Sequence, residues 1–137
     1  MKMMTLIDSN VLLDLATRNS EWYSWSAEQV ERVSENSAIA INPLIYAEIS
    51  VSYKHIKEVE NAYPSDIFLR LPIPYEAAFL AGKAHRKYKM RGGSRTSTLP
   101  DFFIGAHAAI SKLRVLTRDP RRFRQYFPSV ELIAPGT

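Results

Sequence analysis

The sequence has no cysteine, only three histidines and no long apolar run. Without thiolates the chain can form neither a disulfide nor a zinc–thiolate site, and such a composition suits a reducing compartment. No stretch approaches the ~20 apolar residues of a transmembrane helix, and too few apolar residues follow Lys2 for a signal peptide. We therefore expect a cytoplasmic protein that makes no use of a membrane.

The histidines and serines give little support to a zinc site, a histidine general base or a serine nucleophile. No two histidines have the spacing of zinc ligands. His107 lies among alanines and is predicted to be a packed, hydrogen-bonded side chain rather than a catalytic base. Ser9 lacks the sequence signature of a nucleophile elbow. Metal-dependent hydrolysis is therefore the expected chemistry.

Acidic residues are scarce in the second half of the chain. Residues 71–137 carry twelve basic and four acidic side chains, a net charge of +8. Residues 1–70 carry six basic and ten acidic side chains, a net charge of −4. The basic half favours a polyphosphate partner, although the basic residues of the helix predicted from Tyr75 can equally form an ordinary solvated face.

The basic segment 91–98 differs from the helix before it. It contains two glycines and four hydroxyl side chains, and it leads directly towards Asp101. From this position we predict that Arg91 and Arg95 contact a substrate.

Strands and helices alternate along the chain. Strands are expected near 4–8, 38–41, 68–71, 114–117 and 130–133. Helices are expected up to Thr17, over 25–35, from Pro43 through Tyr53 and on to Ala62, from Tyr75, from Asp101 and over 121–127. This alternation predicts an α/β fold with a mostly parallel central sheet flanked by helices on both faces. No linker or internal repeat divides the chain, so residues 1–137 are expected to form a single domain.

Four carboxylates occupy special positions in this pattern. Asp8 and Asp119 each follow a predicted strand, Asp101 begins a helix after Pro100, and Glu48 lies within an apolar helical segment. Each aspartate alone can be explained as a helix cap, and Glu48 alone as an exposed or paired residue. The carboxyl ends of parallel strands, however, meet at one edge of a sheet, where open α/β folds build their sites.

Four carboxylates at one edge would repel one another. Two unit charges ~4 Å apart at an effective dielectric constant of ~20 repel by about 4 kcal/mol. Bound cations or raised pKa values must offset this repulsion, and hard divalent ions are the simplest solution.

The ordered motifs resemble the acidic quartet of PIN-domain ribonucleases. They are Asp8-x-Asn10, the interior Glu48, the helix start at Asp101 and the segment Leu116-Thr117-Arg118-Asp119. In length the chain resembles a VapC-type toxin of a toxin–antitoxin pair, and the likeness extends from about Met4 to Ile133.

This resemblance implies a function and a set of partners. Asp8, Glu48, Asp101 and Asp119 are then expected to bind Mg²⁺ or Mn²⁺ and to support RNA cleavage. Asn10 and Thr117 are expected to orient the ligands and water. A cognate antitoxin and a homodimer are the implied protein partners.

Two other functions remain open at this point. Asp8 could instead be the nucleophile of an aspartyl-phosphate phosphatase, although Asn10 stands where that fold normally has a second acid. A non-catalytic module that binds RNA or protein would keep the acids only as a stabilising cluster. Activity separates the three, because only the nuclease would cleave RNA and only the phosphatase would form a covalent adduct on Asp8.

Trp25 is a candidate for protein contact. On a helix from Trp22 to Val33, the side chains of Tyr23, Val30 and Val33 are predicted to define an inward face, which leaves Trp25 to one side. Trp25 then either packs under a neighbouring helix or forms part of a docking surface on the acidic half. The resemblance supplies the antitoxin as the occupant of that surface.

Overall fold

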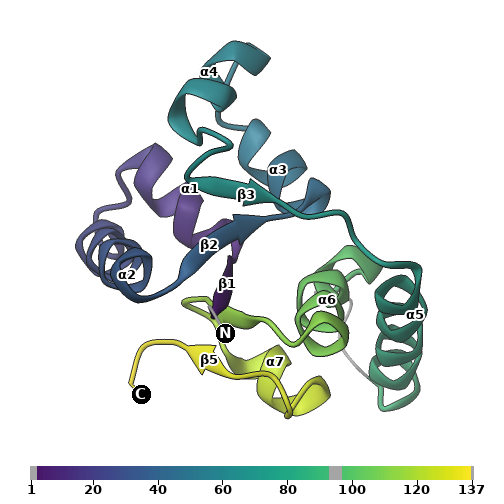
Figure 1. Cartoon of the computed structure of the whole chain (residues 1–137). Helices are drawn as coiled ribbons and strands as arrows, with labels where there is room; N and C mark the ends of the chain where they lie inside the picture. Colours follow the sequence, from purple (N-terminus) through teal and green to yellow (C-terminus); the bar gives the residue numbers. More distant parts are fainter. Residues whose placement is uncertain (1–2, 93–96, 137) are drawn as a thin grey trace.

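The computed structural model describes residues 3–92 and 97–136, and its centre is a five-stranded sheet (Figure 1). Every neighbouring pair of strands is parallel, in the order β3-β2-β1-β4-β5. The strands are β1 (Met4–Ile7), β2 (Ala38–Ile41), β3 (Phe68–Arg70), β4 (Arg114–Leu116) and β5 (Leu132–Ile133). The α/β architecture predicted from the sequence is confirmed.

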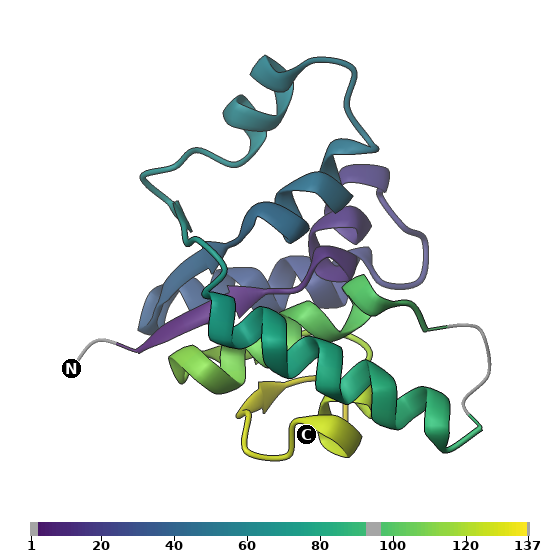
Figure 2. The same cartoon turned by 90° about the vertical axis from the view of Figure 1, so that its right-hand side faces the viewer.

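Helices cover both faces of this sheet. They are α1 (Ser9–Thr17), α2 (Tyr23–Asn36), α3 (Pro43–Ser50), α4 (Ile56–Ala62), α5 (Tyr75–Met90), the 3₁₀ helix η1 (Leu99–Phe102), α6 (Phe103–Ser111) and α7 (Arg121–Tyr126). Figure 1 shows α1 and α2 on one side of the strands and α5 and α6 on the other. Figure 2 shows the long α5 lying against α6, and these two helices pack together. None of the helices within the described ranges has the length and apolar character needed to cross a membrane.

The strand order creates a crevice at the carboxyl ends of β1 and β4. The chain passes from β1 through β2 to β3 on one side, and β4 and β5 later extend the other side. Ligands of open α/β folds bind where the strand order reverses in this way. The backbone N–H of Asp8, just after β1, donates to the carbonyl of Leu116 in β4 at 2.9 Å. Segments from both halves of the chain therefore meet at this point.

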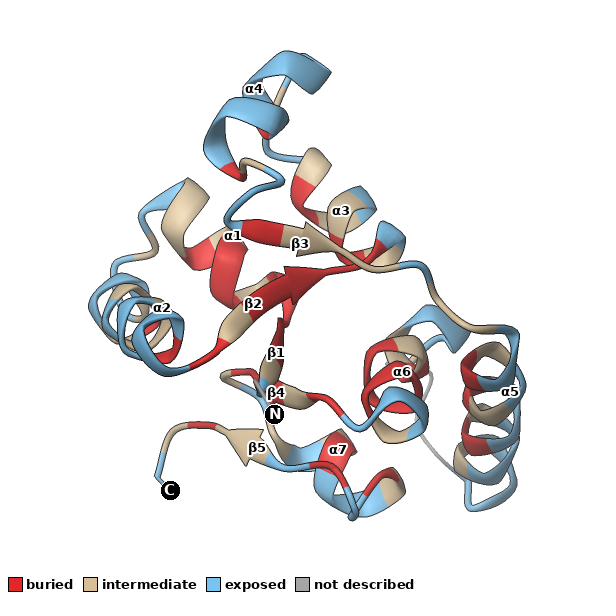
Figure 3. Cartoon of the chain, viewed as in Figure 1, coloured by how far each residue is buried: buried red, intermediate tan, exposed pale blue. Residues whose placement is uncertain are grey.

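The core lies between the sheet and its helices. Figure 3 shows buried residues concentrated in β1 and β2 and on the inner side of α6. β1 and β2 are buried on both faces because helices cover each side. Gly105 in α6 faces the ring of Phe127 so closely that a Cβ atom would collide with it. The small side chains of α6 therefore permit its close packing.

The structure corrects some details of the sequence prediction. The helix from Pro43 ends at Ser50 rather than Tyr53. A separate helix, α4, begins at Ile56, and Glu58 in its first turn caps it by accepting the backbone N–H of His55 at 2.9 Å. Tyr23, predicted to face inwards, is 36% exposed. Ser26 is buried on α2 instead, because its hydroxyl donates to a buried carboxylate of α1.

Candidate active site

One cavity, of about 190 Å³, is lined by all four carboxylates that the sequence pattern indicated. They come from four segments: Asp8 follows β1, Glu48 belongs to α3, Asp101 to η1, and Asp119 to the connection between β4 and α7. Helix capping gives no reason for side chains to converge. Their convergence makes this cavity the candidate active site.

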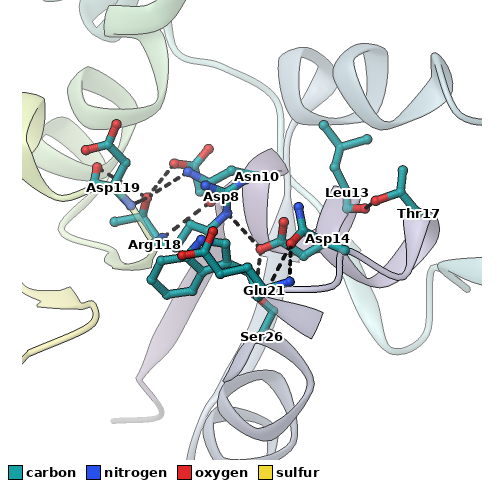
Figure 4. Close-up of polar contacts among 12 residues, drawn as sticks. Asp8, Asn10, Leu13, Asp14, Thr17, Glu21, Ser26, Arg118 and Asp119 are labelled. Carbon is teal, nitrogen blue, oxygen red and sulfur yellow. Dashed lines mark hydrogen bonds and ion pairs between the residues drawn. The ribbon is translucent and has the colours of Figure 1, made fainter. Parts of the chain in front are cut away.

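Thr117 connects the Asp8 carboxylate to Asn10 and to the backbone of Asp119. Its buried hydroxyl donates to Asp8 Oδ2 at 2.8 Å and accepts from the Asn10 amide at 3.3 Å. The same oxygen accepts the backbone N–H of Asp119 at 3.1 Å. Figure 4 shows Asp8, Asn10 and Asp119 gathered around this point. One hydroxyl thus holds the Asp8 carboxylate in place beside the Asp119 segment.

Asp8 is a buried carboxylate whose ionisation is opposed by its surroundings. Burial raises the pKa of Asp8 to about 6, and the charge of Glu48 contributes in the same direction. The hydrogen bond from Thr117 and the charge of Arg122 lower the pKa and offset only part of this effect. A carboxylate in this position is stabilised by a neighbouring cation.

Glu48 extends from α3 into the same cavity. The hydroxyl of Ser9 donates to its Oε1 atom at 2.8 Å. Burial raises the pKa of Glu48, and the nearby charge of Asp101 adds to the increase. Nothing in the sequence around Ser9 indicates this contact with a residue 39 positions away.

The two remaining carboxylates are more accessible. Asp101 Oδ2 accepts the backbone N–H of Thr98 at 2.6 Å and the Thr98 hydroxyl at 3.2 Å, so Asp101 also caps η1. Asp119 forms an ion pair with Arg121 at 3.2 Å, but both side chains are at least half exposed. This pair contributes little to stability, and Asp119 stays available to a ligand.

The chain also matches a known protein family. The sequence model of the PIN domain family matches residues 5–127. The chain belongs to the PIN domain family. No curated protein sequence matches the chain.

Several solved structures are similar to this chain in fold. A chain of VapBC2 from Rickettsia felis, bound to a DNA fragment from its promoter, has a TM-score of 0.72 and 16% identity, covering 96% of this chain and 98% of that chain. A toxin–antitoxin complex from Klebsiella pneumoniae gives a TM-score of 0.68 and 23% identity over 96% and 97% of the two chains. FitAcB from Neisseria gonorrhoeae gives 0.69 and 18% over 95% and 96%. At these identities the likeness establishes the fold.

Arg122 is a residue of this PIN domain's site that the sequence did not single out. It lines the carboxylate cavity, and its guanidinium donates to the Ser97 hydroxyl at 2.9 Å and lies 5.6 Å from the centre of the Phe102 ring. In the sequence it is one of several arginines after Asp119. Arg122 and Arg124 are distinguished only by their positions around the axis of α7, which leave Arg124 exposed.

The two arginines predicted to contact substrate have different outcomes. Arg91 is the C-cap residue that follows α5; it is exposed, and its guanidinium lies 5.8 Å from the centre of the Tyr126 ring on α7. Arg95 lies outside the described residues. Substrate contact by both remains a prediction.

Asp14, which was not among the residues predicted from the sequence, fixes the segment next to the site. Its buried carboxylate accepts from Arg118 Nε and from the Ser26 hydroxyl, each at 2.8 Å (Figure 4). Arg118 also lies 5.6 Å from the centre of the Trp22 ring. These contacts tie the connection after β4 to α1 and α2, and so they help to position Thr117. A charged residue within the apolar α1 is the signal that could have identified Asp14.

His107 is a packing residue, as its sequence context predicted. It is 1% exposed, and the Asn42 amide donates to its Nδ1 atom at 3.0 Å. Burial lowers the pKa of His107. The neutral imidazole therefore holds α6 against the start of α3.

The donors around the cavity suit a hard divalent cation, since all four acids offer oxygen ligands. Within residues 3–92 and 97–136, no three acidic or imidazole groups are close enough to enclose an ion unaided. Mg²⁺ commonly keeps several waters and needs only one or two protein carboxylates. The buried Asp8, with its raised pKa, provides the negative charge that such an ion would neutralise.

Proposed function

We propose that this PIN domain is a divalent-metal-dependent endoribonuclease and the toxin of a toxin–antitoxin pair. The observation that carries the proposal is the convergence of four carboxylates, one of them buried with a raised pKa, on a single cavity. The net charge of +8 on residues 71–137 supports a polyphosphate substrate. Fold similarity to chains of toxin–antitoxin complexes supports the biological role.

The carboxylates have distinct roles in this proposal. Asp8 and Asp101 are the central ligands, Asp119 completes the set directly or through water, and Glu48 binds a second ion or holds a hydrated one. When bound, Mg²⁺ or Mn²⁺ would polarise the scissile phosphate and lower the pKa of the attacking water. Carboxylates serve as ligands here rather than as nucleophiles.

The surrounding polar residues orient these ligands. Thr117 donates to Asp8 and Asn10 donates to Thr117, so rotation of the Asp8 carboxylate breaks a connected set of hydrogen bonds. The Ser9 hydroxyl likewise orients the Glu48 carboxylate by donating a hydrogen bond to it. Arg91 and Arg95 are proposed to contact the phosphates of the bound RNA.

Metal dependence tests the proposal. We expect the purified protein to cleave RNA with Mg²⁺ or Mn²⁺ and to lose this activity in EDTA, because the carboxylates alone would repel the phosphate backbone. Gel electrophoresis of total RNA, with mapping of the new ends, measures both. Undiminished cleavage after exhaustive chelation would exclude the mechanism, and a covalent phosphoryl adduct on Asp8 would favour a phosphatase.

A protein partner is the second part of the proposal. The half-buried Trp25 stacks edge-on against Trp22, with ring centres 5.8 Å apart, at the start of α2. We propose that a cognate antitoxin covers this acidic, aromatic surface and blocks the metal site, and that the protein forms a homodimer.

Truncating Trp25 is expected to weaken the antitoxin complex alone. Loss of a partly buried aromatic anchor costs about 2 kcal/mol, or ~30-fold in Kd, while RNA cleavage by the free protein stays unchanged. Isothermal titration calorimetry of Trp25→Ala with the product of the neighbouring gene measures this. Tyr75→Ala, which truncates a 92% exposed ring on α5, serves as the control. Equal affinities of wild type and Trp25→Ala would assign Trp25 to packing only.

A further inference from the structure

A second cavity, of about 310 Å³, lies beside the carboxylate cavity. Besides Asp119, its lining consists of two tyrosines, two arginines, a serine and a glutamine: Tyr88, Tyr126, Arg121, Arg122, Ser97 and Gln125. Both Asp119 and Arg122 line the two cavities in common. A linear polymer held at the carboxylates therefore continues directly into this second space.

The tyrosines of this cavity are held in a packed aromatic group. The ring of Tyr88 on α5 lies 5.6 Å from that of Phe102, and the ring of Tyr126 on α7 lies 5.4 Å from the same phenylalanine. The two tyrosine rings are 6.3 Å apart, and both side chains are half-buried. Rings fixed on helices in this way offer an apolar surface to a planar ligand at a low cost in conformational entropy.

Arginines border these rings. Arg122 is held by Ser97 and by the face of Phe102, so its charge is fixed at the boundary between the two cavities. Arg91 lies over the Tyr126 ring, and Arg121, which lines the second cavity, forms an ion pair with Asp119 at 3.2 Å. Aromatic rings for bases combined with arginines for phosphates are the means by which proteins bind single-stranded nucleic acids.

We propose that this second cavity binds the base of the nucleotide next to the phosphate that lies at the carboxylates. Its ligand is an unpaired nucleotide of single-stranded RNA, because a base in a duplex is already stacked and cannot reach a tyrosine. Arg122 binds the phosphate between the two cavities. The position of the cleaved phosphate rests on the proposed nuclease function, whereas the binding of the base does not.

Two probes of equal charge separate stacking from electrostatics. One is a fluorescein-labelled octaribonucleotide of mixed sequence, and the other is an octamer of abasic ribose phosphates. Fluorescence anisotropy with Asp8→Asn protein in EDTA measures binding without cleavage. Introducing Tyr126→Leu into the Asp8→Asn protein is expected to weaken binding of the base-bearing octamer about tenfold or more and to leave the affinity for the abasic octamer unchanged. Tyr53→Leu, a half-buried tyrosine that lines neither cavity, should change neither affinity.

Equal weakening of both probes, or no weakening of either, would overturn the proposal. Because Tyr126 packs against Phe102, its replacement could disturb the fold, and photocrosslinking provides a test without that change. An octamer containing 4-thiouridine, irradiated with Asp8→Asn protein, should crosslink to Tyr88, Gln125 or Tyr126 in peptide mass spectra. Crosslinks confined to other segments would also overturn it.

The outcome is separable from that of the nuclease proposal. If the wild-type protein fails to cleave RNA but the octamer crosslinks in this cavity, the base site stands and the nuclease proposal fails. If RNA is cleaved and Tyr126→Leu affects both octamers equally, the nuclease proposal stands and the base site fails.

Discussion

Replacing Asp8 or Asp101 by asparagine is expected to reduce the rate of RNA cleavage on the order of 10³-fold or more while the protein stays folded. Asparagine keeps the shape of the side chain but removes the negative charge that a divalent ion requires. In Asp8→Asn the amide oxygen can still accept the hydrogen bond from Thr117, so the local structure is retained. Single-turnover cleavage of a labelled RNA, with circular dichroism to verify folding, measures the effect.

An exposed aspartate provides the matched control for this loss. Asp66 lies in the connection before β3, is exposed and does not line the carboxylate cavity. Asp66→Asn changes the net charge by the same amount but leaves the carboxylate cavity intact, so it should cleave RNA at the wild-type rate. Full activity in a well-folded Asp8→Asn or Asp101→Asn protein would contradict the metal site.

Asp8→Asn is also expected to make the metal-free protein more stable at neutral pH. Because burial raises the pKa of Asp8 from its ordinary value of 3.8 to about 6, the folded state binds this proton more tightly than the unfolded state does. The ionised carboxylate therefore destabilises the fold above pH 6, by about 3 kcal/mol at most at 1.36 kcal/mol per pKa unit. The penalty is absent below pH ~4 and develops as the pH rises from ~4 to ~6.

Urea unfolding in EDTA over pH 4–8 measures this effect. The free energy of unfolding of Asp8→Asn should exceed that of the wild type at pH 8 and converge with it towards pH 4. Addition of Mg²⁺ should stabilise the wild type selectively, since an ion that binds only the folded state adds stability by mass action. Identical pH profiles for Asp8→Asn and wild type would show that Asp8 ionises without cost in the fold.

Local patterns were sufficient to predict most of the secondary structure. The apolar run before Asp8 and the run over 114–117 have strand propensity, and each gives way to polar residues where its strand ends. Helix boundaries were less predictable, because local backbone contacts of the folded chain accompany them: just before α2, Asn19 Oδ1 accepts the backbone N–H groups of Glu21 and Trp22, each at 2.9 Å. The alternation of strands and helices was nevertheless enough to imply a parallel sheet.

The candidate site divides along the same line. Sequence position alone indicated that Asp8, Asp101 and Asp119 follow strands or begin helices, and this pattern predicted their meeting at one sheet edge. It could not indicate that Ser9 supports Glu48 or that Asp14 anchors Arg118. Such pairs are far apart in the chain, and nothing in the residues next to either partner reflects the contact.

By itself the sequence determined the α/β class, the acidic quartet, the absence of thiol chemistry and the unequal charge of the two halves, because each follows from residue type and local spacing. The tertiary structure alone decided that the Thr117 hydroxyl contacts both Asp8 and Asn10, each of which is more than a hundred residues away from it in the chain. It also decided that Arg122 borders two cavities while Arg124 borders neither. Strand order and helix packing set these relations, and they arise only when segments distant in sequence bury their surfaces against one another.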